Sequence, residues 1–166
     1  MTEDGRRADW RFLLPDPDLG RVAYLPPHDP ELVSALERCG AVVDGCGAGE
    51  HEVVVMTGSR AVERASGLLR AGGWLYAEAP GWRTGAWKRR LRRCGFDEVT
   101  AYWLWPSASG CREIVPLEPT ALHHALARRD PGARFRIRAR LAGLVARTRL
   151  FRLALRDAAV VGRWSG

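Results

Sequence analysis

Residues 51–80 read HEVVVMTGSRAVERASGLLRAGGWLYAEAP, and they hold two apolar runs on either side of a helix-like segment. The first run, residues 53–56, is short and fully apolar, which is typical of a strand buried on both faces of a parallel sheet. Ser59 can cap the helix that follows, and Gly72 and Gly73 can end it before the second run. The stretch therefore predicts a strand–helix–strand crossover, which in a parallel sheet is right-handed.

The same alternation of apolar runs and helical segments extends in both directions along the chain. It indicates an α/β fold with a mostly parallel sheet and flanking helices. The helix expected at 31–39 has a clear start, because Asp29 can cap it and Pro30 suits its first position. Further strands are expected at 20–26, 41–44, 96–105 and 157–164, with an extended segment at 111–117 and helices at 84–94 and 119–129.

A chain of 166 residues predicts one domain. We assign residues 1–19 to an N-terminal arm, with residues 1–7 disordered. After them, Trp10, Phe12 and Leu14 alternate with other residues and predict an edge strand or an extended segment. Residues 20–166 then form a single α/β domain, in which residues 106–156 are a helical insertion before the last strand.

Composition restricts the function classes. The net charge is +7 and its basic residues are almost all arginines, which favours acidic partners. No apolar run approaches the ~20 residues of a membrane span, and the polar first residues do not resemble a signal peptide, so we expect a cytoplasmic protein without a membrane partner. The four cysteines form no CxxC pair and no cluster with zinc spacing, so we expect reduced thiols and no metal.

Three stretches together resemble the class I S-adenosylmethionine-dependent methyltransferases, a Rossmann-like family. HEVVVMTG (51–58) is similar to the family's fourth strand, and ASGLLRAGGWLYAEAP (65–80) to its next helix and fifth strand, with a "LLxPGGxL"-type pattern. LRRCGFDEVTAYWLWP (91–106) is similar to a late helix and strand around a Gly-Phe pair. The resemblance implies a Rossmann-like, mostly parallel sheet whose last strand is antiparallel. Too few residues follow Asp44 for the usual third strand, so we expect that region to be deleted.

The resemblance also implies a cofactor site, and here the sequence departs from the family. The family's first strand ends in a glycine-rich loop that approaches the cofactor closely, whereas residues 26–30 read PPHDP. Prolines supply no N–H donors. The glycine-rich stretch at 43–49, VDGCGAG, precedes a strand rather than a helix, which favours a flexible turn over a cofactor loop. The positions that the resemblance gives for cofactor binding are Pro27, Asp44, Thr57 and Gly58.

These departures predict a methyltransferase-like pseudoenzyme that has lost cofactor binding and acts as a partner-binding or accessory subunit, for example in bacterial peptide or natural-product biosynthesis. The partner would be another protein or peptide of acidic character, in a hetero-oligomer. The amphipathic segment 133–156 is flanked by arginines and suits such a surface. The partner-binding residues are then Trp103, Trp105, Arg140, Arg147, Arg149 and Arg152.

Other hypotheses stay open at this point. The chain could be an active S-adenosylmethionine-dependent methyltransferase with a remodelled cofactor loop, in which His123 or His124 would be the catalytic base. Nucleic-acid binding by the arginines is less favoured, because no nucleic-acid motif is present. Acid–base chemistry at Cys46 or His28 is a further hypothesis.

Overall fold

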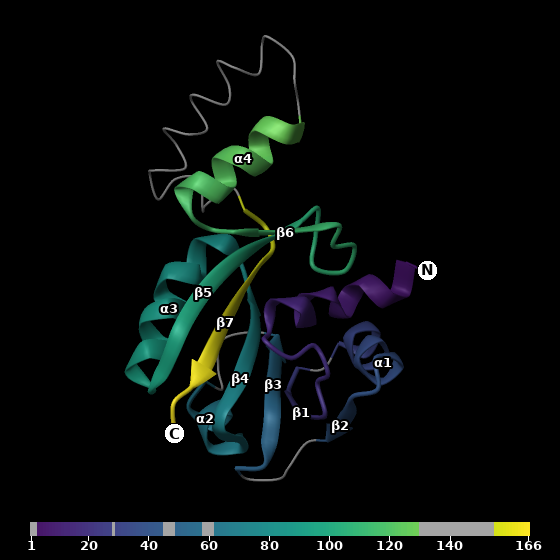
Figure 1. Ribbon diagram of the computed structural model, residues 1–166, viewed down its shortest axis with the longest axis vertical. Coiled ribbons are helices and arrows are strands. Elements are labelled where there is room, and N and C mark those ends of the chain that lie inside the picture. The colour runs from purple at the N-terminus through teal and green to yellow at the C-terminus, as the bar shows by residue number, and fades with distance from the viewer. Residues whose placement is uncertain (1–2, 28, 45–48, 58–61, 130–154) are drawn as a thin grey trace.

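The computed structural model describes residues 3–27, 29–44, 49–57, 62–129 and 155–166. A seven-stranded sheet in the order β2-β1-β3-β4-β7-β5-β6 forms its centre (Figure 1). The strands are β1 (Arg21–Leu25), β2 (Val42–Asp44), β3 (His51–Thr57), β4 (Leu69–Ala79), β5 (Phe96–Trp105), β6 (Glu113–Pro116) and β7 (Ala158–Trp164). The helices are η1 (Glu3–Leu13), α1 (Pro30–Arg38), α2 (Val62–Leu68), η2 (Gly81–Arg83), α3 (Thr84–Arg93) and α4 (Pro119–Arg129).

The fold class predicted from the sequence is confirmed. Strands β2, β1, β3 and β4 are parallel, and β7 is antiparallel to both β4 and β5. Among the described residues, no strand pairs on the outer side of β2, in agreement with a deleted third strand. The insertion contributes β6 as well as helix α4, and β6 pairs antiparallel with β5.

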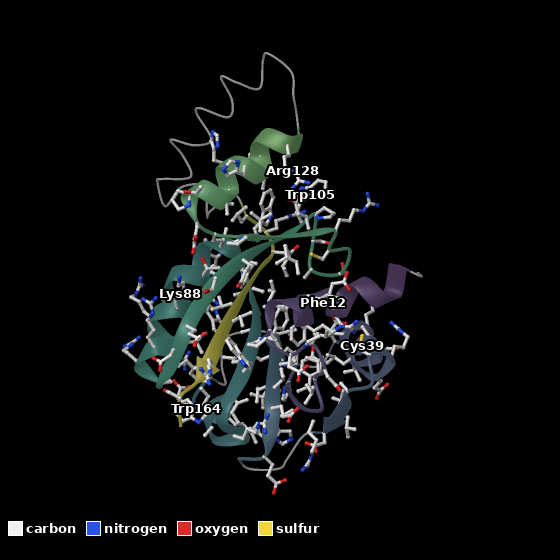
Figure 2. The ribbon with its side chains drawn as sticks, viewed as in Figure 1. Phe12, Cys39, Lys88, Trp105, Arg128 and Trp164 are labelled. Atoms are coloured by element: carbon white, nitrogen blue, oxygen red, sulfur yellow. The ribbon has the colours of Figure 1, made fainter. Side chains whose placement is uncertain are left out.

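Two apolar cores cover the two faces of the sheet, because alternate strand residues point to opposite sides. One core joins the sheet to α2 and α3, through residues such as Leu68, Trp87 and Leu91. The other joins it to η1 and α1, through residues such as Trp10, Leu32 and Leu36. Figure 2 shows the described side chains on the ribbon. The helices therefore switch faces between β1 and β3, and this switch decides where a ligand site is expected.

The N-terminal arm differs from the expectation. Residues 3–13 form a 3-10 helix rather than a disordered end and an edge strand. In a 3-10 helix, residues three apart lie on one face, and Arg7 and Trp10 are both buried. The strand alternation would have buried Phe12, which is instead 63% exposed.

The pair Gly72 and Gly73 also has another role than the one expected. Helix α2 ends at Leu68, and both glycines lie inside β4. Here the pairing of β3 with β4 shifts its register between His51 and Val53. Gly73 fits because a Cβ there would lie 3.0 Å from the Arg70 carbonyl oxygen and 3.1 Å from that of Glu52.

Candidate functional site

The carboxyl ends of the parallel strands are where open α/β sheets bind ligands, at the point where the helices switch faces. In this chain that point lies between β1 and β3. The loop after β1 and the end of β3 meet there, because the Thr57 hydroxyl donates a hydrogen bond of 2.6 Å to the Pro27 carbonyl. Two of the residues predicted for cofactor binding are thus brought together, while Gly58 lies outside the described residues.

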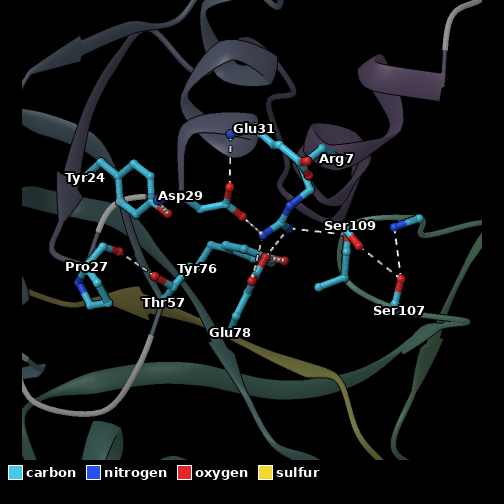
Figure 3. A network of polar contacts seen from close by, with 12 residues as sticks. Arg7, Tyr24, Pro27, Asp29, Glu31, Thr57, Tyr76, Glu78, Ser107 and Ser109 are labelled. Atoms are coloured by element: carbon cyan, nitrogen blue, oxygen red, sulfur yellow. Dashed lines mark hydrogen bonds and ion pairs between the residues drawn. The ribbon is translucent and has the colours of Figure 1, made fainter.

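Arg7 of helix η1 reaches this edge from the N-terminal end of the chain (Figure 3). Its Nη2 donates to Asp29 Oδ2 at 2.8 Å and to Glu78 Oε2 at 2.9 Å. Its Nη1 contacts Glu78 Oε1 and donates to the Ala108 carbonyl at 3.4 Å. The Arg7 side chain is only 5% exposed. The chain's own guanidinium therefore fills the space between the carboxyl end of β4 and the start of α1.

The two carboxylates at this edge have several partners. The Tyr76 hydroxyl donates to Glu78 Oε1 at 2.9 Å. Burial raises the pKa of Tyr76 well above its usual range, so this phenol stays a donor. Burial also tends to raise the pKa of Asp29, but the hydrogen bond from Arg7 and other favourable contacts outweigh it and lower that pKa. Asp29 is therefore an ionised partner of Arg7.

Aromatic packing holds η1 against the sheet beside this bridge. The Trp10 ring stacks on the Tyr76 ring, with centroids 4.0 Å apart and an interplanar angle of 10°. Both rings are at most 2% exposed. Trp10 Nε1 and Arg7 Nε are buried without a hydrogen-bond partner among the described residues.

The start of α1 satisfies its own backbone donors. Asp29 caps the helix by accepting from the Glu31 N–H at 3.0 Å. The Asp29 N–H in turn donates to the Tyr24 hydroxyl at 2.9 Å. This helix start is the place where a cofactor's negative charge would otherwise be received.

Asp44 lies apart from Pro27 and Thr57. It pairs with Ala23 of β1, two residues before that strand ends. One carboxylate oxygen contacts the buried His51 ring, and the other accepts from Arg21 at 2.9 Å. His51 first and Arg21 second lower the pKa of Asp44 to about 2. The acid that the resemblance gives for cofactor binding therefore already has two partners.

The other predicted site residues are dispersed. His123 and His124 are exposed on α4, with ring centroids 5.9 Å apart, and α4 contacts β6 at the opposite end of the strand order from β2. Trp103 and Trp105 are half-buried on β5, where Trp103 packs against the core. Arg140, Arg147, Arg149 and Arg152, like Cys46 and His28, lie outside the described residues.

Sequence reasoning missed Arg7, Tyr76 and Glu78. An acidic residue at the end of a buried strand was an available signal, because a carboxylate there needs a partner. Nothing near Glu78 in the sequence indicated that the partner is Arg7.

No group of three or more His, Cys, Asp or Glu side chains in the described part could hold a metal ion. No helix in that part is both long and apolar enough to cross a membrane.

No protein-family model and no curated protein matches the sequence. Among solved structures, an S-adenosylmethionine-dependent methyltransferase from Thermotoga maritima is similar, with a TM-score of 0.42, 11% identity, and 97% of this chain and 87% of that chain covered.

Two further solved structures are similar to this chain. A Haemonchus contortus phosphoethanolamine N-methyltransferase, in complex with phosphomonomethylethanolamine and S-adenosylhomocysteine, has a TM-score of 0.45 and 9% identity over 98% of this chain and 52% of its own. The cyclase SpnF has a TM-score of 0.42 and 14% identity over 96% of this chain and 80% of its own. At TM-scores below 0.5 these similarities carry no information on ligands or activity. The fold assignment rests on the order and direction of the strands.

Proposed function

We propose that this protein is a methyltransferase-like subunit without S-adenosylmethionine chemistry of its own, and that it acts by binding a partner protein or peptide. The observation that carries the proposal is the bridge from Arg7 to Glu78 and Asp29 at the carboxyl edge of the sheet. A ligand that entered here would have to displace a 5% exposed guanidinium from two carboxylates. Breaking such a buried pair leaves charges without partners and is costly.

The loop after β1 supports the same proposal. S-adenosylmethionine seated in the family's usual way needs backbone N–H groups from this loop. Of residues 26–31, three are prolines, and the N–H groups of Asp29 and Glu31 already have acceptors. The described residues of the loop therefore do not supply the donor set that this cofactor takes.

The positive charge of the chain favours an acidic partner. With a net charge of +7, the protein attracts acidic surfaces and repels basic ones. A partner within a bacterial peptide or natural-product pathway would be encoded beside this chain. Binding would then show as a complex of defined stoichiometry when the two purified proteins are mixed.

Calorimetric titration of S-adenosylmethionine and S-adenosylhomocysteine into the full-length protein, up to millimolar concentration, tests the cofactor half of the proposal. We expect no saturable heat. Saturable binding in the micromolar range would overturn it and restore an active methyltransferase with a remodelled loop at Pro27 and Thr57. Light scattering of mixtures with each neighbouring gene product tests the other half, which fails if the protein stays monomeric beside all of them.

A further inference from the structure

Helix α3 and the short helix η2 before it carry charge of one sign only, which is positive. From Gly81 to Arg93 the sequence GWRTGAWKRRLRR contains six basic residues and no acid. Within the described part of the chain, no ion pair joins Arg83, Arg89, Arg92 or Arg93 to an acidic group. Arg90 is held by Glu63 of α2, through contacts of 2.8–3.0 Å. The acidic neighbour of this helix is therefore already neutralised.

An apolar ring is exposed beside the first of these cations. Trp82 is 53% exposed, and the Arg83 guanidinium lies 4.7 Å from the centre of its ring. A partner that covers an exposed indole removes apolar surface from water, and tryptophan and arginine are enriched among the residues that dominate binding energy. In contrast, Trp87 on α3 is 4% exposed and packs into the core.

A groove of about 310 Å³ joins these features. It is lined by Trp82, Arg83, Ala86, Trp87, Arg90 and Arg93. Its apolar part comes from Ala86 and the two indoles, and its rim is formed by arginines. The groove is thus large enough for one apolar side chain and offers positive charge around it.

From this arrangement we infer that the groove along α3 is the docking surface for an acidic peptide segment with one large apolar side chain. The inference rests on the proposed partner-binding function and names the place where binding occurs. The apolar side chain would lie against Trp82 and Ala86, and carboxylates on either side of it would meet Arg83 and Arg93. Arginine recognises carboxylates with two parallel hydrogen bonds, which gives the segment its orientation.

Two other occupants fit less well. A second copy of this chain carries the same net charge of +7, so like charges would oppose its docking in a basic groove. A single-stranded nucleic acid needs a continuous positive channel with several stacking rings, whereas Trp82 is the one indole of this groove that is exposed by half or more.

Fluorescence anisotropy with the full-length protein and labelled synthetic peptides tests the inference. The probe is a short peptide of glutamates around one phenylalanine. Its controls are the same peptide with serine in place of phenylalanine, and an oligothymidine of similar charge. The protein variants are Trp82→Ala, Arg93→Glu and Arg38→Glu.

Arg38→Glu is a matched control for charge reversal. Arg38 is the last residue of α1, as Arg93 is the last residue of α3, so both changes place an acid at a helix C-terminus. Helix α1 lies on the opposite face of the sheet. The exposure of Trp82 means that its truncation should leave the fold intact, which a thermal melt checks.

We expect the phenylalanine peptide to bind wild type and Arg38→Glu alike, and to bind Trp82→Ala and Arg93→Glu at least ~10-fold more weakly. Equal binding to all variants would overturn the assignment of the groove as the docking surface, but it would not contradict the proposed partner-binding function. Tighter binding of the oligothymidine or of the serine peptide would overturn the stated partner chemistry. No binding to wild type at millimolar peptide would also overturn the assignment of the groove as the docking surface. The titration with S-adenosylmethionine tests the proposed function separately.

Discussion

Arg7 and Glu78 are 71 residues apart in the sequence, and the Arg7 guanidinium contacts both oxygens of the Glu78 carboxylate. The pair joins the first helix of the chain to the carboxyl end of β4. The same guanidinium reaches Asp29 at the start of α1. One arginine thus fixes the position of three elements at the edge where a ligand is expected.

Replacing Arg7 by alanine is expected to lower the free energy of unfolding by about 3 kcal/mol, because Glu78 would be left buried without its cation. Urea denaturation measures the change. Arg11→Ala on the same helix is the control, with an expected loss below about 1 kcal/mol, because its guanidinium only lies over the exposed Phe12 ring. Combining Arg7→Met with Glu78→Gln should recover part of the loss. If Arg7→Ala and Arg11→Ala cost the same, the bridge does not hold η1 in place.

Asp29 has two roles that different substitutions separate. Asn keeps a capping oxygen for the Glu31 N–H but removes the charge that faces Arg7, whereas Ala removes both. We expect Asp29→Ala to cost about 1 kcal/mol more than Asp29→Asn in urea denaturation, the usual contribution of a helix cap. Equal losses would mean that the cap contributes nothing and that only the ion pair counts.

The sequence predicted most of the fold because the elements away from the N-terminus follow local rules. Apolar runs such as residues 53–56 specify buried strands, and Asp29 followed by Pro30 marks the start of α1. These signals depend on neighbours within a few residues. The order of the elements along the chain then led to the mostly parallel sheet, and the family resemblance implied that its last strand, β7, is antiparallel.

The candidate site was harder to predict because its contacts are distant in sequence. The bridge between Arg7 and Glu78 joins residues 71 apart in the sequence and has no local pattern. The alternation of Trp10, Phe12 and Leu14 fits a strand, whereas the three-residue spacing of Arg7 and Trp10 fits a 3-10 helix. Packing of Trp10 on Tyr76, distant in sequence, accompanies the helix. Likewise, the partners of Asp44 depend on how β2 and β3 flank β1.

The contacts of Asp44 predict how the stability of the fold changes in acid. Its pKa is lowered from 3.8 to about 2 by His51 and Arg21, so the folded state holds this proton less tightly than the unfolded chain does. The stabilisation is therefore complete above about pH 4 and is lost as the pH falls through about 2. We expect Asp44→Asn to reduce the fall in melting temperature between these pH values, measured by circular dichroism. Asp97→Asn is the control, because the Asp97 side chain is exposed on β5, and this variant should follow wild type. An unchanged acid response in Asp44→Asn would contradict the contacts with His51 and Arg21.

Replacing Gly67 of α2 or Gly73 of β4 by alanine is expected to change the free energy of unfolding in opposite directions. Gly67 is exposed in helix α2 and a Cβ there would meet nothing within 4 Å, so Gly67→Ala should raise the free energy of unfolding by roughly 0.5–1 kcal/mol. Gly73 lies in β4, where a Cβ would come within 3.0 Å of the Arg70 carbonyl oxygen and 3.1 Å of that of Glu52. Because these are backbone atoms of paired strands, they cannot move aside easily.

Gly73→Ala should therefore lower the free energy of unfolding by about 1–3 kcal/mol, the usual cost of overpacking. Both variants are compared with wild type by urea denaturation at one pH. The sign of each change is the decisive result. A stabilised Gly73→Ala variant would mean that the close approach of β3 and β4 at Glu52 is not present in solution, and the register shift between His51 and Val53 would then have to be revised.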